Sequence, residues 1–363
     1  MELLTVFVAG ALLILSIWWW RRVLSYPRPR SVAISGLDPS TRIPSCTEDV
    51  ELFYNDLSAH SLKVRVCLSE AGIPFKAHRL ALLPWDGFDT KTPAFLAVNP
   101  AGTVPVLVHQ GHPVYESLEQ MIYVAKALAP VHRSGETSPP PLLLPPGEKE
   151  ADRVVAAVRE IAQLNLDDLF SDPTACLRRS PTNTIFPMTI PLFCALIAQN
   201  CCLFTVMKIL AWVPFLTAKT RRFLGLVMLV KLFGVAGLKK IGPLMSVARN
   251  VRWALDFHLG RLEAALGVEG SAGPYLYGDL YTLADICWVP FLQRLEQARW
   301  WPEFEGKYPL VHAYWRRIKE REATGACQPE RAMKERLTRA GLLLDAWKAE
   351  HNWFREIYTG QQN

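Results

Sequence analysis

A run of twenty-six residues from Asn99 to Val124 constrains the fold of this chain more than any other stretch. It begins with Asn-Pro-Ala-Gly, which are turn residues, and continues as an apolar segment with Pro105 near its start. Because proline cannot donate to a sheet ladder, Pro105 belongs at the first residues of a strand or on a sheet edge. A proline held there is also a candidate for a cis peptide bond.

A second turn at Gln110-Gly111-His112 returns the chain into another strand, and a helix follows from Ser117. The Ser-Leu-Glu-Gln sequence at 117–120 matches a capping box, in which Gln120 would reach back to the start of the helix. Apolar residues then recur at helical spacing. The stretch predicts a strand–turn–strand–helix unit with a proline at the edge of its inner strand.

The preceding residues add a strand, a helix and a second strand. Val50 to Tyr54 reads as a strand, a helix begins near Ser58 and ends at Gly72, and Phe75 to Leu82 reads as the next strand. The order strand, helix, strand, loop, strand, strand, helix predicts a thioredoxin-like domain at 49–130.

Ser58 is the candidate reactive position of this domain. A hydroxyl at a helix N-terminus lies among free backbone N–H groups and at the positive end of the helix dipole, and both favour an anion. A thiol bound there would ionise more readily than a free cysteine, whose pKa is about 8.5. The alternative is that Ser58 or Ser61 merely caps the helix.

The Val-Pro-Val-Leu sequence at 104–107, followed about ten residues later by Glu-Ser, resembles the glutathione-binding half of the cytosolic glutathione S-transferases. The resemblance implies that Val104, before a cis Pro105, pairs its backbone with the cysteinyl part of glutathione. It also implies that Glu116 and Ser117 hold the γ-glutamyl end. A plain β-hairpin with a capped helix is the alternative.

Residues 58–68, Ser-Ala-His-Ser-Leu-Lys-Val-Arg-Val-Cys-Leu, resemble the opening of serine-type transferases such as the theta and zeta classes. The resemblance assigns the catalytic, thiol-activating role to Ser58 and implies glutathione as the co-substrate, with no metal. Ser61 is the weaker candidate. We expect His60 to be a solvated loop residue, and the alternative is that it polarises the thiol. Thr103 stands where many members have Lys or Gln, a change expected to reduce glutathione affinity.

The second half of the chain predicts an all-α domain at 148–350, after a proline-rich linker at 131–147 and before a tail at 351–363. Its Gly-Asp-x-x-Thr-x-Ala-Asp sequence at 278–285 resembles the capped core helix of the transferase C-terminal domain. Thr282 would cap this helix and Asp285 would reach back to its start. Both roles are structural.

The N-terminus predicts a membrane anchor at 1–24, joined by a linker at 25–48. Leu3 to Trp20 contains no charge, ends in three tryptophans and precedes two arginines, which is typical of a transmembrane helix. A cleaved signal peptide is the alternative. The basic residues after the span predict that the rest of the chain is cytosolic, on the endoplasmic reticulum or the mitochondrial outer membrane.

A hydrophobic insertion at 180–240 interrupts the second half, and three interpretations are open. It forms one or two membrane spans, a monotopic segment in the headgroup region, or apolar core helices that line the electrophile pocket. Flanking lysines and arginines favour the monotopic interpretation. This expansion resembles the membrane-anchored ganglioside-induced differentiation-associated protein subgroup.

Composition limits the remaining possibilities. The net charge of +6 is mild and scattered, and no nucleic-acid-binding motif is present. The eight cysteines include no CxxC, so neither a zinc site nor a disulfide framework is predicted. The resemblance and the N-terminal span together imply a membrane-anchored transferase that joins glutathione to a small apolar electrophile, with membrane lipid as a partner and homodimer formation left open. The alternative is a weakly active or inactive protein of this fold that acts as a membrane adaptor or organelle-shaping factor.

Overall fold

The computed structural model describes residues 29–82, 87–133, 143–202, 230–268 and 273–360, together with Gly10, Ile14, Ile17 and Met228. Within the predicted membrane anchor at 1–24, only Gly10, Ile14 and Ile17 are described. The anchor therefore stays a prediction.

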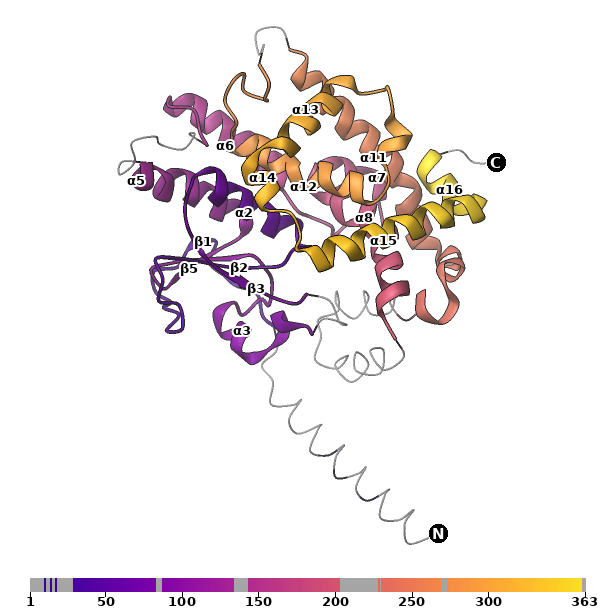
Figure 1. Cartoon of the computed structure of the whole chain (residues 1–363), viewed down its shortest axis with the longest axis horizontal. Helices are drawn as coiled ribbons and strands as arrows, with labels where there is room; N and C mark the ends of the chain where they lie inside the picture. Colours follow the sequence, from indigo (N-terminus) through magenta and orange to yellow (C-terminus); the bar gives the residue numbers. More distant parts are fainter. Residues whose placement is uncertain are drawn as a thin grey trace.

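The N-terminal domain is thioredoxin-like, with a mixed five-stranded sheet in the order β1-β5-β4-β2-β3. Strands β2 and β3 are parallel, and the other neighbours are antiparallel. Helix α2 covers one face of the sheet and α3 lies on the other (Figure 1). The elements are β1 (Gly36–Leu37), β2 (Val50–Tyr54), α2 (Ala59–Glu70), β3 (Lys76–Arg79), the 3-10 turn η1 (Asp89–Lys91), α3 (Pro93–Val98), β4 (Val106–His109), β5 (His112–Tyr115), α4 (Ser117–Tyr123), the π turn η2 (Val124–Leu128) and α5 (Ala129–Arg133).

The segment at 25–48 is more than the predicted linker. Gly36 and Leu37 pair with Tyr115 and Val114, so they add an edge strand to the sheet. Ile43 is buried in the core on the α3 face of the sheet. A two-residue strand is too short to leave a periodic pattern, which is why the sequence did not reveal it.

The C-terminal domain is helical and shares its core with the N-terminal domain. Buried residues of β2, α2 and α4 belong to the same apolar cluster as those of α8, α11 and α12. The elements are α6 (Glu148–Ala162), α7 (Pro173–Arg179), α8 (Pro181–Asn200), the 3-10 turn η4 (Val235–Lys240), α11 (Gly242–Leu266), α12 (Leu283–Gln297), the 3-10 turn η5 (Trp301–Phe304), α13 (Pro309–Glu320), α14 (Glu322–Ala326), α15 (Arg331–Glu350) and α16 (Asn352–Thr359). Helix α16 occupies much of the predicted tail and buries Phe354 and Tyr358.

The capping box of α12 is confirmed. The Asp285 carboxylate accepts hydrogen bonds from the Thr282 backbone N–H at 2.8 Å and from the Thr282 hydroxyl at 3.1 Å. Its other oxygen accepts from the Leu276 N–H at 3.0 Å and from the Tyr314 hydroxyl at 2.8 Å. Burial raises the pKa of Asp285, and these hydrogen bonds act in the opposite direction.

Helix α8 covers the first third of the predicted insertion. It is long and apolar enough to span a bilayer, yet 72% of its most hydrophobic window is buried within the protein. Pro187 and Pro191 lie inside it, and the Thr189 hydroxyl donates to the Ile185 carbonyl at 3.0 Å and the Phe186 carbonyl at 2.8 Å. For α8 this burial favours a core helix; residues 203–227 lie outside the described part of the chain.

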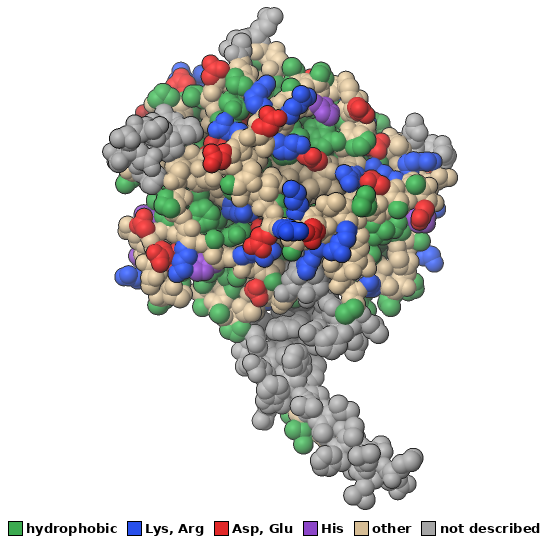
Figure 2. Space-filling view, viewed as in Figure 1, with side chains coloured by type: hydrophobic (Ala, Val, Ile, Leu, Met, Phe, Trp, Pro, Cys, Tyr) green, Lys and Arg blue, Asp and Glu red, His purple; other side chains and the backbone are tan. Residues whose placement is uncertain are grey.

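Charges of both signs are mixed over the face shown in Figure 2, with no large region of one sign. Seven of the eight cysteines are buried, and Cys202 is exposed. The buried cysteines therefore behave as small apolar core residues.

Candidate functional site

The turn between β2 and α2 presents Ser58 at the first turn of a helix. Ser58 is half-buried and has extended backbone angles (φ −78°, ψ 115°), as an N-cap residue does. Its Oγ accepts a hydrogen bond from the Ser61 N–H at 3.1 Å. Within the described residues no acceptor binds the Ser58 O–H, so this donor is available to a ligand at the helix N-terminus.

Asn55 and Ser61 hold this turn in place. The Asn55 side chain donates to the Leu80 carbonyl at 2.6 Å and accepts from the Leu57 N–H at 2.8 Å. The Asn55 N–H donates to the Ser61 Oγ at 3.3 Å, and Ser61 is fully buried. These bonds give Ser61 a structural role and leave Ser58 as the more accessible, half-buried hydroxyl of the turn.

Arg294 of α12 reaches the same turn from the helical domain. Its guanidinium donates to the Leu57 carbonyl at 2.9 Å and to the Asp56 carbonyl at 3.3 Å, directly before Ser58. Arg294 is buried, and burial lowers its pKa to about 10, against the opposing effect of the Asp56 carboxylate. That carboxylate also pairs with Arg65 at 3.2 Å and with Arg79 at 2.8 Å. The backbone that carries Ser58 is therefore fixed from both domains.

The Val104–Pro105 peptide bond is cis, which confirms the sequence expectation. Val104 is half-buried, and its backbone N–H and C=O make no hydrogen bond within the described residues. Gln120 of α4 donates to the Pro105 carbonyl at 3.0 Å and to the Val114 carbonyl at 2.8 Å. The start of α4 is thereby joined to the cis-proline turn.

The capping box predicted at 117–120 is wrong. Helix α4 begins at Ser117 itself, its N-cap is Glu116, and no side chain caps it. Gln120 points to the strands, as its bonds to two strand carbonyls show. Glu116 is exposed and has φ 64° and ψ 120°, a conformation that L-residues rarely adopt. The first N–H groups of α4 are therefore not bound by a capping side chain.

His60 joins the two helix starts. Its Nδ1 lies 3.1 Å from the Ser117 Oγ, so the first turn of α2 and the first residue of α4 are in direct contact. Burial, together with the Lys63 ammonium, lowers the His60 pKa to about 3, and the ring is neutral near pH 7. The expectation of a solvated loop residue is therefore wrong for His60.

Lys63 and Lys91 are two basic residues that sequence reasoning missed. Lys63 is buried on α2, and its Nζ has no partner among the described residues. Burial lowers its pKa, whereas Cys287 and Glu116 raise it. The Lys91 Nζ donates to the Gly102 carbonyl at 2.6 Å, next to exposed Thr103, and burial lowers its pKa. Neither lysine is part of a recognisable motif.

The structure thus brings Ser58, Val104, Pro105, Glu116 and Ser117 to one region. The contacts that join them are His60 with Ser117 and Gln120 with Pro105. A hydroxyl donor, an unpaired backbone segment and an uncapped helix start are suited to a peptide-like ligand that carries an anion. Among the described residues no cluster of metal-binding side chains is found.

Comparison with known proteins agrees with this geometry. Residues 57–127 match the family described as glutathione S-transferase, N-terminal domain, and residues 245–322 match glutathione S-transferase, C-terminal domain. Two segments of the chain therefore resemble the two domains of the glutathione S-transferases. No curated protein sequence matches it.

Two solved structures are similar to this chain. A beta-etherase from Sphingobium sp. has a TM-score of 0.54 and 20% identity, over 77% of this chain and 98% of that one. A maleylacetoacetate isomerase from Methylobacterium extorquens, with bound malonate and glutathione, has a TM-score of 0.46 and 20% identity over 77% and 97%. At 20% identity, the likeness to the beta-etherase shows the fold alone.

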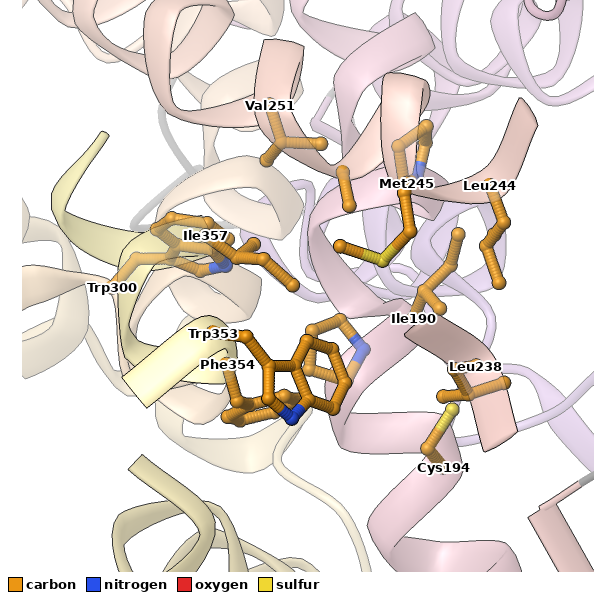
Figure 3. Close-up of a pocket in the computed structure, with 13 residues that line it drawn as sticks. Ile190, Cys194, Leu238, Leu244, Met245, Val251, Trp300, Trp353, Phe354 and Ile357 are labelled. Carbon is orange, nitrogen blue, oxygen red and sulfur yellow. The ribbon is translucent and has the colours of Figure 1, made fainter. Parts of the chain in front are cut away.

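An apolar cavity of about 30 Å³ lies apart from this site, between α8, η4, α11 and α16 (Figure 3). Cys194 and Leu238 point into it on one side, with Trp353 and Phe354 on another. No residue of α2 or α4 lines it. It is therefore a packing gap in the helical domain and is separate from the Ser58 region.

Proposed function

We propose that the protein is a glutathione transferase that joins the glutathione sulfur to a small apolar electrophile. The observation that carries the proposal is the free Ser58 hydroxyl at the start of α2, next to Ser117 of α4 through His60. The two family domains support glutathione as the ligand of this region.

Each candidate residue has a task in this proposal. The free N–H and C=O of Val104 pair with the cysteinyl unit, and cis Pro105 holds this backbone segment beside the ligand. The Ser117 hydroxyl and the uncapped N–H groups of α4 bind the γ-glutamyl carboxylate, while the exposed Glu116 carboxylate binds its ammonium. The cysteinyl sulfur then lies at the Ser58 hydroxyl.

The chemistry follows from the position of the sulfur. The thiol releases its proton to water, and the Ser58 O–H donates a hydrogen bond to the thiolate that forms. The thiolate attacks the electrophilic carbon, a C–S bond forms, and the leaving group departs with the electron pair of its bond. Neutral His60 adds no positive charge to the ligand region, so Ser58 and the α2 dipole supply the stabilisation.

The glycyl end of glutathione needs a cation, and Thr103 cannot provide one. The Asn99 side chain donates to the Thr103 carbonyl at 2.8 Å and to its hydroxyl at 3.2 Å, so Thr103 serves the turn. The Lys91 ammonium donates to the carbonyl of Gly102, the residue before Thr103. We assign this cation to the glycyl carboxylate. In this proposal Lys91 replaces the glycyl-binding side chain that many transferases have at the position of Thr103.

Conjugation by the full-length protein tests the proposal. With glutathione and a chlorodinitroarene, the protein should release chloride and form the thioether at a rate that saturates with glutathione. Absence of both glutathione binding and conjugation would leave the alternative, a membrane adaptor or organelle-shaping factor, as the better explanation.

Membrane attachment through residues 1–24, with the two domains in the cytosol, belongs to the same proposal. It is supported by the uncharged run from Leu3 to Trp20 and by the arginines that follow it. A protein held at the bilayer would meet electrophiles that partition into lipid. Alkaline extraction of cell membranes checks this, because a transmembrane protein stays in the pellet.

A further inference from the structure

The middle of the chain contains an unusually long segment without acidic residues. No Asp or Glu occurs in the 83 residues from Pro173 to Leu255, whereas Lys and Arg occur eleven times. The other 280 residues contain 29 basic and 34 acidic side chains. The positive charge of the protein is therefore concentrated in one segment of the helical domain.

Part of this segment forms an exposed surface at the edge of the helical domain, where the salmon-coloured chain precedes α11 (Figure 1). Leu232 and Phe233 are 62% and 63% exposed. Lys239 and Lys240 at the end of η4 are also exposed. We call these four residues the docking surface. Two large apolar side chains and two lysines within nine residues are an unusual set for a surface turn.

The segment that carries the docking surface is held to the helical domain by buried side chains and a hydrogen bond. Val235 and Leu238 of η4 are buried in the main core, between the apolar pair and the lysines. The Lys231 Nζ donates to the Ala198 carbonyl at 3.0 Å, which ties the segment to the end of α8. The exposed side chains are consequently presented by a packed framework.

The lysines of the docking surface are not neutralised by ion pairs in the part of the chain that the structure describes. Within the described residues, Lys239 and Lys240 form no ion pair, and neither does Arg249 farther along α11. Other basic residues of the helical domain are paired, as Arg252 is with Asp256 at 3.3 Å and Arg261 is with Glu160 at 2.7 Å. Arg249 also borders a shallow polar hollow of about 290 Å³ that begins at Gly242, two residues after Lys240. Unpaired cations and exposed apolar side chains within nine residues complement a surface whose outer layer is anionic and whose interior is apolar.

We propose that the docking surface binds an anionic lipid bilayer. Leu232 and Phe233 enter the boundary between headgroups and acyl chains, and Lys239 and Lys240 lie at the level of the lipid phosphates. This contact is separate from the predicted N-terminal anchor. It also does not depend on glutathione chemistry, because no residue of the Ser58 region takes part.

Hydrogen exchange in the full-length protein tests the proposal. Because the N-terminal apolar stretch can itself hold the protein on vesicles, the readout must be local: the protection of backbone amides at 230–241. The protein is reconstituted in phosphatidylcholine vesicles with and without phosphatidylserine. Protection should rise in the anionic vesicles and fall again when salt is added, since salt screens charge at the surface.

Paired variants separate this contact from a general charge effect. Substitution K239Q/K240Q should lower the added protection roughly 30-fold, at about fivefold for each lysine. The matched control K149Q/K334Q removes two exposed lysines outside the acid-free segment and should leave the protection unchanged. L232S/F233S should abolish the added protection at 230–241. Glutathione conjugation should be the same in all three variants.

Three results would overturn the proposal. The first is equal protection at 230–241 in neutral and anionic vesicles. The second is equal loss in K239Q/K240Q and in the control K149Q/K334Q. The third is protection by added RNA but not by anionic vesicles, which would assign the surface to nucleic acid.

Discussion

The two helix starts of the candidate site are built in different ways. At α2, Ser58 has ordinary N-cap angles and its Oγ accepts from the helix. The preceding turn is held because the Leu57 N–H donates to the Asn55 side chain and Arg294 donates to the Leu57 carbonyl. At α4, no side chain caps the helix and Glu116 adopts φ 64°. One start is stabilised by a hydrogen-bonded framework, and the other contains backbone strain.

This difference agrees with the two tasks in the proposed mechanism. Stabilising a thiolate needs one donor in a precise place, and the framework around Ser58 provides that precision. Binding a charged amino-acid end needs several open backbone donors, and an uncapped helix provides them. In this account, the strained backbone of Glu116 accompanies a helix start whose N–H groups remain available to the ligand.

Loss of the Ser58 hydroxyl should have the largest effect. Ser58→Ala removes the donor to the thiolate, and kcat for conjugation should fall roughly 100- to 1,000-fold, by analogy with loss of one oxyanion donor. Glutathione affinity should change little. Steady-state kinetics with varied glutathione checks this, and a similar loss in Ser61→Ala would contradict the assignment to Ser58.

Arg294→Met tests whether the framework positions Ser58. It leaves the Asp56 and Leu57 carbonyls without their partner, so kcat should fall about tenfold with little change in the glutathione KM. The control is Arg321→Met, which breaks the pair of Arg321 with Glu70 (2.6 Å) at the other end of α2. Both variants should melt at lower temperature, but only Arg294→Met should lose kcat when assayed well below its melting temperature.

Two substitutions at Glu116 separate strain from binding. Glu116→Gly relieves the φ strain and removes the carboxylate, whereas Glu116→Ala removes only the carboxylate. The glycine variant should be more stable than the alanine variant by about 1 kcal/mol in urea unfolding. Both should raise the glutathione KM about tenfold, through loss of one charge-assisted bond. Equal stability of the two would show that position 116 is unstrained.

The smallest effect concerns His60 and pH. Folding lowers its pKa from 6.5 to about 3, so the unfolded state binds this proton more readily. The stabilising contribution is therefore present above pH 6.5 and is lost as pH falls toward 3. In His60→Asn, the free energy of unfolding should fall less steeply below pH 6.5 than in the wild type. Chemical unfolding at several pH values measures the two slopes.

Local patterns predicted much of this molecule. The order of strands and helices at 50–124, the cis Pro105 and the Thr282–Asp285 capping box all follow from residues close together in sequence. The bond from Arg294 to Leu57 spans 237 residues and could not be foreseen from either segment. The error at 117–120 has a different cause. The Ser-x-x-Gln sequence fits a capping box only if Ser117 is the N-cap, but the N-cap is Glu116, with φ 64°, and the helix already begins at Ser117.

The pKa of the glutathione thiol in the complex tests the central claim most directly. It is measured from thiolate absorbance against pH, with saturating glutathione and either the wild type or Ser58→Ala. The account predicts a midpoint well below that of a free cysteine thiol, about 8.5, in the wild type and a return toward it in the variant. The same midpoint in both proteins, or one equal to that of free glutathione, would contradict thiolate stabilisation by Ser58.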